Sequence, residues 1–113
     1  MARASHSSVE DDIIALLRET GIARKTAKGN EWPQCRELTG ITRDDQPFFL
    51  YIYQGRYSGR TIIRITPTPQ DCIHALYTPN ALYVVHIGNE EELKKSLEIK
   101  IKTITRIHGQ SKQ

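Results

Sequence analysis

The chain lacks the features that mark a membrane protein or a disulfide-stabilised secreted protein. Among its 113 residues, no apolar run approaches the roughly 20 residues that a membrane-spanning helix needs. The N-terminus has no apolar segment of the kind found in secretory signals. The two cysteines, Cys35 and Cys72, lie far apart, which is more typical of reduced, half-buried thiols than of a disulfide framework. We therefore predict a cytoplasmic protein with reduced cysteines, and a bridge between them is the alternative.

Sequence signatures of catalysis and of cofactor binding are also missing. The chain has no Gly-rich phosphate loop, no nucleophile elbow and no paired CxxC motif. Cys72 and His74 form the only close Cys/His pair, and the other cysteine and histidines lack the spacing of zinc ligands. We therefore predict no cofactor, no metal and no catalytic residues. A small metal-dependent or RNase-type nuclease is kept as an alternative.

The composition is that of an ordinary folded domain. Hydrophobic residues make up 38% of the chain and charged residues 26%, values that argue against disorder of the whole chain. A chain of this length forms one hydrophobic core without a metal or disulfide staple. The sequence predicts a single domain over residues 8–108, with flexible tails at residues 1–7 and 109–113.

The first half of the chain predicts a helix, a basic loop and a hairpin. Apolar residues at spacings of three and four predict a helix over residues 9–20. Residues 24–32 show little apolar periodicity and are interpreted as a basic loop, and residues 36–43 as a first strand. Alternating apolar residues then predict two strands joined by a turn, the central hairpin of residues 48–66.

The second half predicts a helix, a strand and a helix. Thr68 and the proline after it are typical of a helix start, and we expect a short helix that ends near residue 78. The nearly continuous apolar run of residues 81–87 predicts a central strand covered on both faces. A final helix is expected from residue 90, and isoleucine and threonine beyond Glu98 make a strand the alternative there.

The fold class that follows is α+β, in the order helix, strand, strand, strand, helix, strand and helix, with the last element possibly ending as a strand. The side chains expected to form the core are apolar residues of the predicted helix and strands. They are Ile13, Leu16, Leu17, Leu50, Ile52, Ile63, Ile65, Leu82, Val84 and Val85.

Basic and aromatic residues of the hairpin point to nucleic acid as a partner. The net charge of +3 is uneven, because residues 22–66 carry eight basic and four acidic groups. Aromatic rings on a strand can stack on bases, and arginines can pair with phosphates. The predicted contacts are Tyr51, Tyr53, Arg56, Tyr57, Arg60 and Arg64, with secondary basic contacts from Arg24, Lys25 and Lys28. We therefore predict a small DNA- or RNA-binding protein.

A protein-interaction or homo-oligomerisation module is the alternative that shares these observations. A sheet face covered by a helix would bury the same aromatic residues as core. In an oligomer, an exposed strand edge or the C-terminal segment would be the expected interface, because unpaired strand edges invite pairing with another chain.

Overall fold

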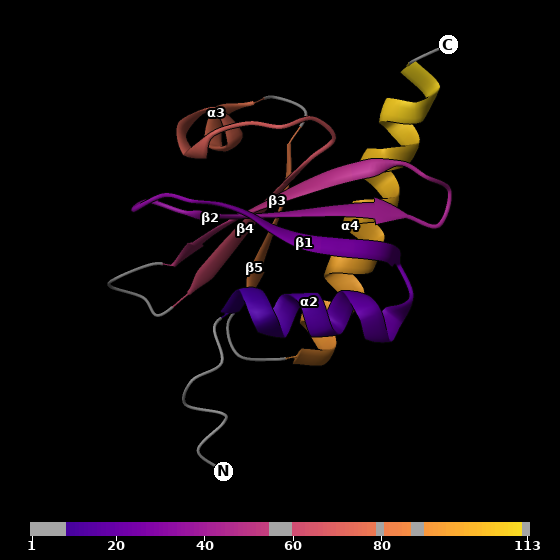
Figure 1. Cartoon of the computed structure of the whole chain (residues 1–113), viewed down its shortest axis with the longest axis horizontal. Helices are drawn as coiled ribbons and strands as arrows, with labels where there is room; N and C mark the ends of the chain where they lie inside the picture. The colour runs from indigo at the N-terminus through magenta and orange to yellow at the C-terminus, as the bar shows by residue number, and fades with distance from the viewer. Residues whose placement is uncertain (1–8, 55–59, 79–80, 87–89, 112–113) are drawn as a thin grey trace.

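Five antiparallel strands form one sheet, and two helices pack on one of its faces (Figure 1). The computed structural model describes residues 9–54, 60–78, 81–86 and 90–111. The elements, in chain order, are α2 (Val9–Thr20), β1 (Ala23–Glu31), β2 (Arg36–Thr42), β3 (Pro47–Gln54), β4 (Thr61–Thr66), α3 (Cys72–Tyr77), β5 (Leu82–His86) and α4 (Glu90–Ser111). The predicted α+β class is confirmed.

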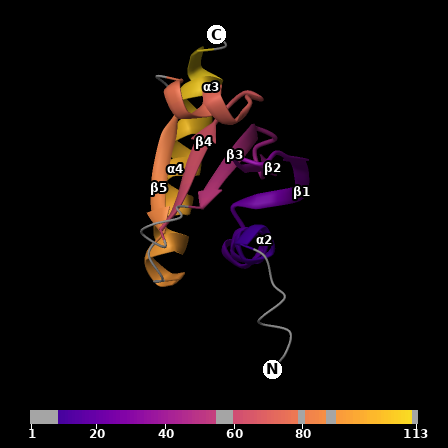
Figure 2. The same cartoon turned by 90° about the vertical axis from the view of Figure 1, so that its left-hand side faces the viewer.

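The sheet is a meander, because each strand pairs with its neighbour in the sequence. Its order is β1-β2-β3-β4-β5, and Figure 2 shows the strands side by side from β5 to β1. The predicted central hairpin is confirmed as β3 and β4, in which Leu50 pairs with Ile65 and Ile52 with Ile63. Strands β1 and β5 are therefore the two edges of the sheet.

The main core lies between the sheet and helices α2 and α4. The first turn of helix α2 contains three acidic residues, Glu10, Asp11 and Asp12, which suit the positive end of the helix dipole. It buries Ile13, Leu16 and Leu17 against the sheet. Gly21 ends it with a φ of 72°, the left-handed conformation that glycine adopts without a steric penalty.

Ten side chains were expected in the core, and eight of them are buried. The two exceptions both lie on β5. Leu82 is only partly buried, and Val85 is 42% exposed. Val85 was wrongly predicted because we interpreted the apolar run as a central strand, whereas β5 is an edge strand whose second face is only partly covered.

Strand β1 replaces the basic loop that the sequence predicted. Residues Ala23–Glu31 pair with β2, although only Ala23 among them is buried. A strand exposed along most of its length has no need for alternating apolar residues, so the periodicity that marks a half-buried strand is absent. The observed order therefore has four strands, not three, between the first two helices.

The last two helices also differ from the prediction in detail. Helix α3 is capped by Asp71, whose carboxylate accepts a hydrogen bond from the backbone N–H of His74 at 2.8 Å. The sequence predicted the start of this helix at Thr68, which lies outside it, because the helix begins only at Cys72. Helix α4 continues to Ser111, so the strand alternative beyond Glu98 is wrong. Its helical stripe of Leu93, Leu97, Ile101 and Ile104 is buried in the main core.

None of the helices within the described ranges combines the length and apolar composition that crossing a membrane requires.

Candidate functional site

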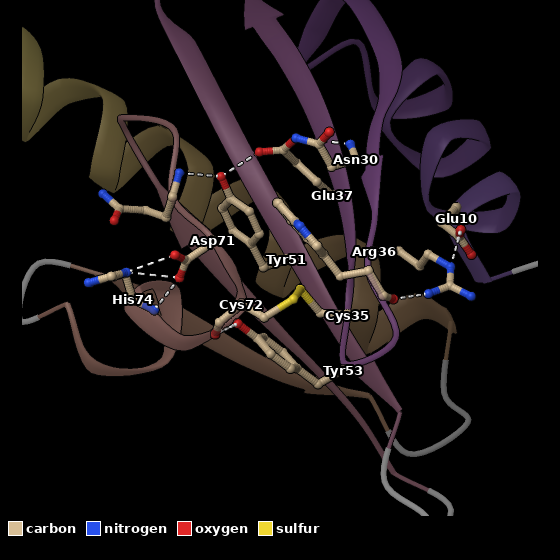
Figure 3. Close-up of a disulfide and its surroundings, with 12 residues drawn as sticks. Glu10, Asn30, Cys35, Arg36, Glu37, Tyr51, Tyr53, Asp71, Cys72 and His74 are labelled. Carbon is tan, nitrogen blue, oxygen red and sulfur yellow. Dashed lines mark hydrogen bonds and ion pairs between the residues drawn. A yellow bond between two sulfur atoms is a disulfide. The ribbon is translucent and has the colours of Figure 1, made fainter.

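The aromatic face of β3 is covered. Tyr51 is fully buried in a second cluster of side chains, on the face of the sheet opposite α2 and α4. Its hydroxyl donates to Glu37 Oε2 at 2.6 Å and accepts from the backbone N–H of Gln70, also at 2.6 Å (Figure 3). Trp32 stacks on the ring with centroids 6.4 Å apart. Tyr51 is therefore part of the core in this structure, not an open stacking platform.

A disulfide holds this cover in place. Cys35 and Cys72 form a bond that links the start of β2 to the first residue of α3 (Figure 3). The prediction of reduced cysteines was wrong because it rested on their separation of 37 residues. The fold brings the β1–β2 connection and α3 together over β3, and separation along the chain carries no information about that meeting.

Tyr53 is tied to the same cover. Its hydroxyl donates to the carbonyl oxygen of Cys72. Burial raises the pKa of Tyr53 to about 12. Burial and the hydrogen bond to Glu37 raise the pKa of Tyr51 well above its ordinary value. Both hydroxyls are therefore neutral and hydrogen-bonded at physiological pH, where they connect β3 to the segment around α3.

These two tyrosines predict a loss of stability at alkaline pH. Both pKa values are raised in the folded state, so the folded chain favours the neutral hydroxyl. The contribution to the free energy of unfolding is fully present below the unfolded tyrosine pKa of about 10 and is lost as pH rises through about 12. Thermal unfolding across this range should show a falling midpoint, coupled to the tyrosinate absorbance. The unfolding midpoint of a Tyr51→Phe/Tyr53→Phe variant should fall less steeply with pH. An equal slope for the variant and the parent would show that the two hydroxyls do not cause the loss of stability.

The predicted arginine contacts are only partly described. Arg56 and Tyr57 lie outside the described residues. Arg60 is exposed just before β4. Arg64 donates from Nε to the carbonyl oxygen of Ala75 at 3.0 Å, and its guanidinium carbon lies 5.8 Å from the centre of the Tyr83 ring. Arg64 therefore joins β4, α3 and β5 to one another.

The secondary basic residues share one strand. Arg24, Lys25 and Lys28 all lie on β1 and are exposed. Arg24 pairs with Asp45 at 2.6 Å and Lys28 with Asp11 at 3.1 Å. The structure thus brings these cations together along an edge of the sheet, with two of the three partly neutralised by carboxylates.

Exposed apolar side chains gather elsewhere, on β4, β5 and α3. Register pairs Ile62 with Val85 and Arg64 with Tyr83, so these four side chains share the outer face of the sheet. Helix α3 packs beside them, as the hydrogen bond from Arg64 to the carbonyl oxygen of Ala75 in α3 shows. We call this the β5 surface: its apolar members are Ile62, Ile73, Leu76, Tyr77, Tyr83 and Val85, with exposed fractions of 36–78%.

The sequence analysis missed this surface, although a signal for it was present. Alternation along β5 places Leu82 and Val84 on the core face and Tyr83 and Val85 on the other. We interpreted the run as covered on both faces because it is nearly continuously apolar, with His86 as the one polar position. A second reading, in which β5 is an edge strand with one apolar face left open, requires only that no later strand pairs with it.

Neither a metal-binding group among the described residues nor similarity to known proteins assigns a function to this chain. The described part of the chain contains no group of three or more histidine, cysteine, aspartate or glutamate residues placed to hold a metal ion. Comparisons of the chain with protein-family models, with curated proteins and with solved structures found no match. The candidate site therefore rests on the chemistry of the chain's own residues.

Proposed function

We propose that this protein is a protein-interaction module that self-associates through β5. The observation that carries the proposal is the difference between the two edges of the sheet. Proteins protect a strand edge from pairing by placing charges on it or by making it irregular. One edge of this sheet has both protections, and the other has neither over Leu82–Val85.

Strand β1 is the protected edge. It carries Arg24, Lys25, Lys28 and Glu31, and its pairing with β2 shifts register in two places. Two copies that met along β1 would bring three cations from each chain close together. Like charges on paired strands are destabilising, so β1 is unsuited to self-pairing.

Strand β5 has the opposite character. Its first four residues, Leu82, Tyr83, Val84 and Val85, carry no charge, and its pairing with β4 runs in one continuous register. An antiparallel copy related by a two-fold axis through Val84 would place Tyr83 of each chain opposite Val85 of the other. Both residues are apolar and exposed, so the strand is complementary to itself.

Burial would then favour association. Removing apolar surface from water contributes roughly 25 cal/mol per Å², and the β5 surface holds six of the seven exposed large apolar side chains among the described residues. The seventh, Ile99, lies on α4. A second copy paired along β5 would cover part of this surface and would satisfy the outer backbone groups of the strand.

Val85→Lys should weaken self-association at least about tenfold, with little effect on folding. Val85 is exposed in one chain, and a lysine on an edge strand opposes pairing with another chain. Sedimentation equilibrium should show a mass that rises with concentration for the parent protein. It should show at least a roughly tenfold weaker association for the variant, about 1.4 kcal/mol.

The matched control is Ile99→Lys. Ile99 is 62% exposed on α4, away from β5, so the same change in charge and apolar content should leave the association unchanged. A parent protein that is monomeric at every accessible concentration would remove the proposal. Equal weakening by both variants would assign the effect to net charge instead of β5.

Nucleic-acid binding is the second candidate. It is supported by the alignment of Arg24, Lys25 and Lys28 along one edge strand and by the exposure of Arg60. It is placed second because Tyr51 is buried and Arg64 is engaged within the fold. Its signature would be an affinity for DNA or RNA that falls steeply with salt, since phosphate contacts release counterions.

The cytoplasmic location stays a prediction from the sequence. The disulfide is compatible with a site outside the cytoplasm, because such bonds persist mainly in oxidising compartments. The mass of the protein isolated from its native host, measured with and without reductant, would show whether the Cys35–Cys72 bond is formed in the compartment where the protein resides.

A further inference from the structure

A cleft of about 780 Å³ lies between the C-terminal end of α2, the β2–β3 turn and α4. In Figure 1, the end of α2 and the β2–β3 turn lie at the same end of the sheet. This volume is within the range of clefts that bind small molecules. None of the residues of the β5 surface lines it, so the cleft is separate from the proposed interface.

Three cations from two distant parts of the chain line the cleft. They are Arg43 from the β2–β3 turn, and Lys102 and Arg106 from successive turns of α4. The lining carboxylates are Asp44 and Glu98. Positive charge is therefore in excess in a concave site, where the field of the cations is concentrated and attracts an anion.

Arg43 is held in position by the end of α2. Its Nε donates to the carbonyl oxygen of Gly21 at 2.7 Å. A Cβ at Gly21 would lie 2.8 Å from Nη2 of Arg43, so the glycine makes room for the guanidinium as well as for the turn. One N–H group of Arg43 is used in this contact, which fixes the side chain beside the cleft.

The two cations of α4 are less constrained. Lys102 pairs with Glu98 at 3.1 Å across one helical turn. Arg106 is exposed, and it makes no hydrogen bond or ion pair with the residues that the structure describes. A planar guanidinium without a carboxylate partner is well suited to bind a phosphate through two parallel hydrogen bonds.

Hydrogen-bond acceptors also line the cleft, and only those that are exposed can meet a ligand. Gln46 lines it, and its Oε1 is buried with no hydrogen-bond partner among the residues that the structure describes. Asp44 and Glu98 add carboxylate oxygens. Asp44 is exposed, whereas Glu98 is already paired with Lys102. A phosphate attached to a molecule with hydroxyl groups would offer a donor to Asp44 and would fill more of the cleft than inorganic phosphate.

We propose that this cleft binds a small organic phosphate, with the phosphate group held by Arg106, Lys102 and Arg43. The shared chemistry is a phosphate monoester or diester, which a sugar phosphate or a polynucleotide backbone could provide. The size of the cleft and the exposed carboxylate of Asp44 favour the small molecule.

Backbone amide NMR shifts during titration with ribose 5-phosphate test the proposal. Residues lining the cleft should shift and saturate, and binding should be weaker for inorganic phosphate. Arg106→Gln and Lys102→Gln should each weaken binding about tenfold, since each removes a charge-assisted contact. Lys95→Gln is the matched control, because Lys95 is an exposed lysine of α4 outside the cleft lining.

A single-stranded oligonucleotide distinguishes the source of the phosphate. Tighter binding than ribose 5-phosphate, with the same sensitivity to Arg106→Gln, would assign the cleft to a polynucleotide backbone. Absence of saturable shifts with all three phosphate probes would overturn the proposal. So would binding that the Lys102→Gln/Arg106→Gln double variant retains at full strength.

Discussion

Removing the Cys35–Cys72 disulfide should lower the free energy of unfolding by about 4 kcal/mol. A bond between residues 37 positions apart restricts the unfolded chain, and the chain-entropy model gives a loss of about this size for such a loop. Both cysteines are buried beside Tyr51, so reductant reaches the bond only when the structure opens. Urea denaturation with and without reductant measures the difference.

The control is the Cys35→Ser/Cys72→Ser variant. Its free energy of unfolding should be close to that of the reduced parent and should not change when reductant is added. Hydroxyls in place of thiols add polar atoms to a buried cluster, so the variant should be no more stable than the reduced parent. A parent protein with one urea midpoint under both conditions would show that the bond contributes nothing to stability.

Phe48→Ala should cost about 3–5 kcal/mol of unfolding free energy, as large-to-small changes of buried aromatics generally do. Phe48 is fully buried in the main core. Its ring packs over Gly40 of the neighbouring strand, where a Cβ would collide with the ring. Gly40 has no side chain that could move into the space left by alanine.

Phe49→Ala is the matched control for this change. Phe49 is the next residue of β3, it points to the opposite face, and it is only partly buried at the edge of the second cluster. Its replacement should cost less than half as much in the same denaturation experiment. Equal costs for the two variants would contradict the assignment of the two faces.

The elements predicted correctly are those whose own sequence periodicity matches the faces that they pack. Residues 48–53 alternate between two faces, and both faces of β3 are indeed used, one for each cluster. Helix α2 shows its apolar stripe equally clearly because only one side of it meets the sheet. In these cases local periodicity reports directly on what the element packs against.

The elements missed are those whose environment is set by distant parts of the chain. Strand β1 is recognisable only through its pairing with β2, because its own residues from Arg24 onward lack the apolar pattern of a buried strand. The disulfide depends on how α3 folds back over β3. Whether an apolar strand such as β5 is central or at an edge depends on the whole sheet order.

The prediction of the candidate site was limited for the same reason, because distant parts of the chain decide which residues are covered. A strand face bearing aromatic residues is equally compatible with a binding platform and with a core. We predicted Tyr51 and Tyr53 as stacking residues of a platform, and Tyr51 is in the core. The segment that covers them contains Gln70 and Cys72, nearly twenty residues further along the chain. Val85 of β5, which is exposed, was assigned to the core because an apolar strand position is equally compatible with a covered face and with an open one.

Amide hydrogen exchange at several protein concentrations tests the role of β5 most directly. Pairing with a second copy would bring the outer N–H groups of β5 into hydrogen bonds. We expect protection of Tyr83–Val85 to rise with protein concentration, while protection of β1, the charged edge, stays constant. Protection of β5 that does not depend on concentration, or that rises along β1 instead, would contradict self-association through β5.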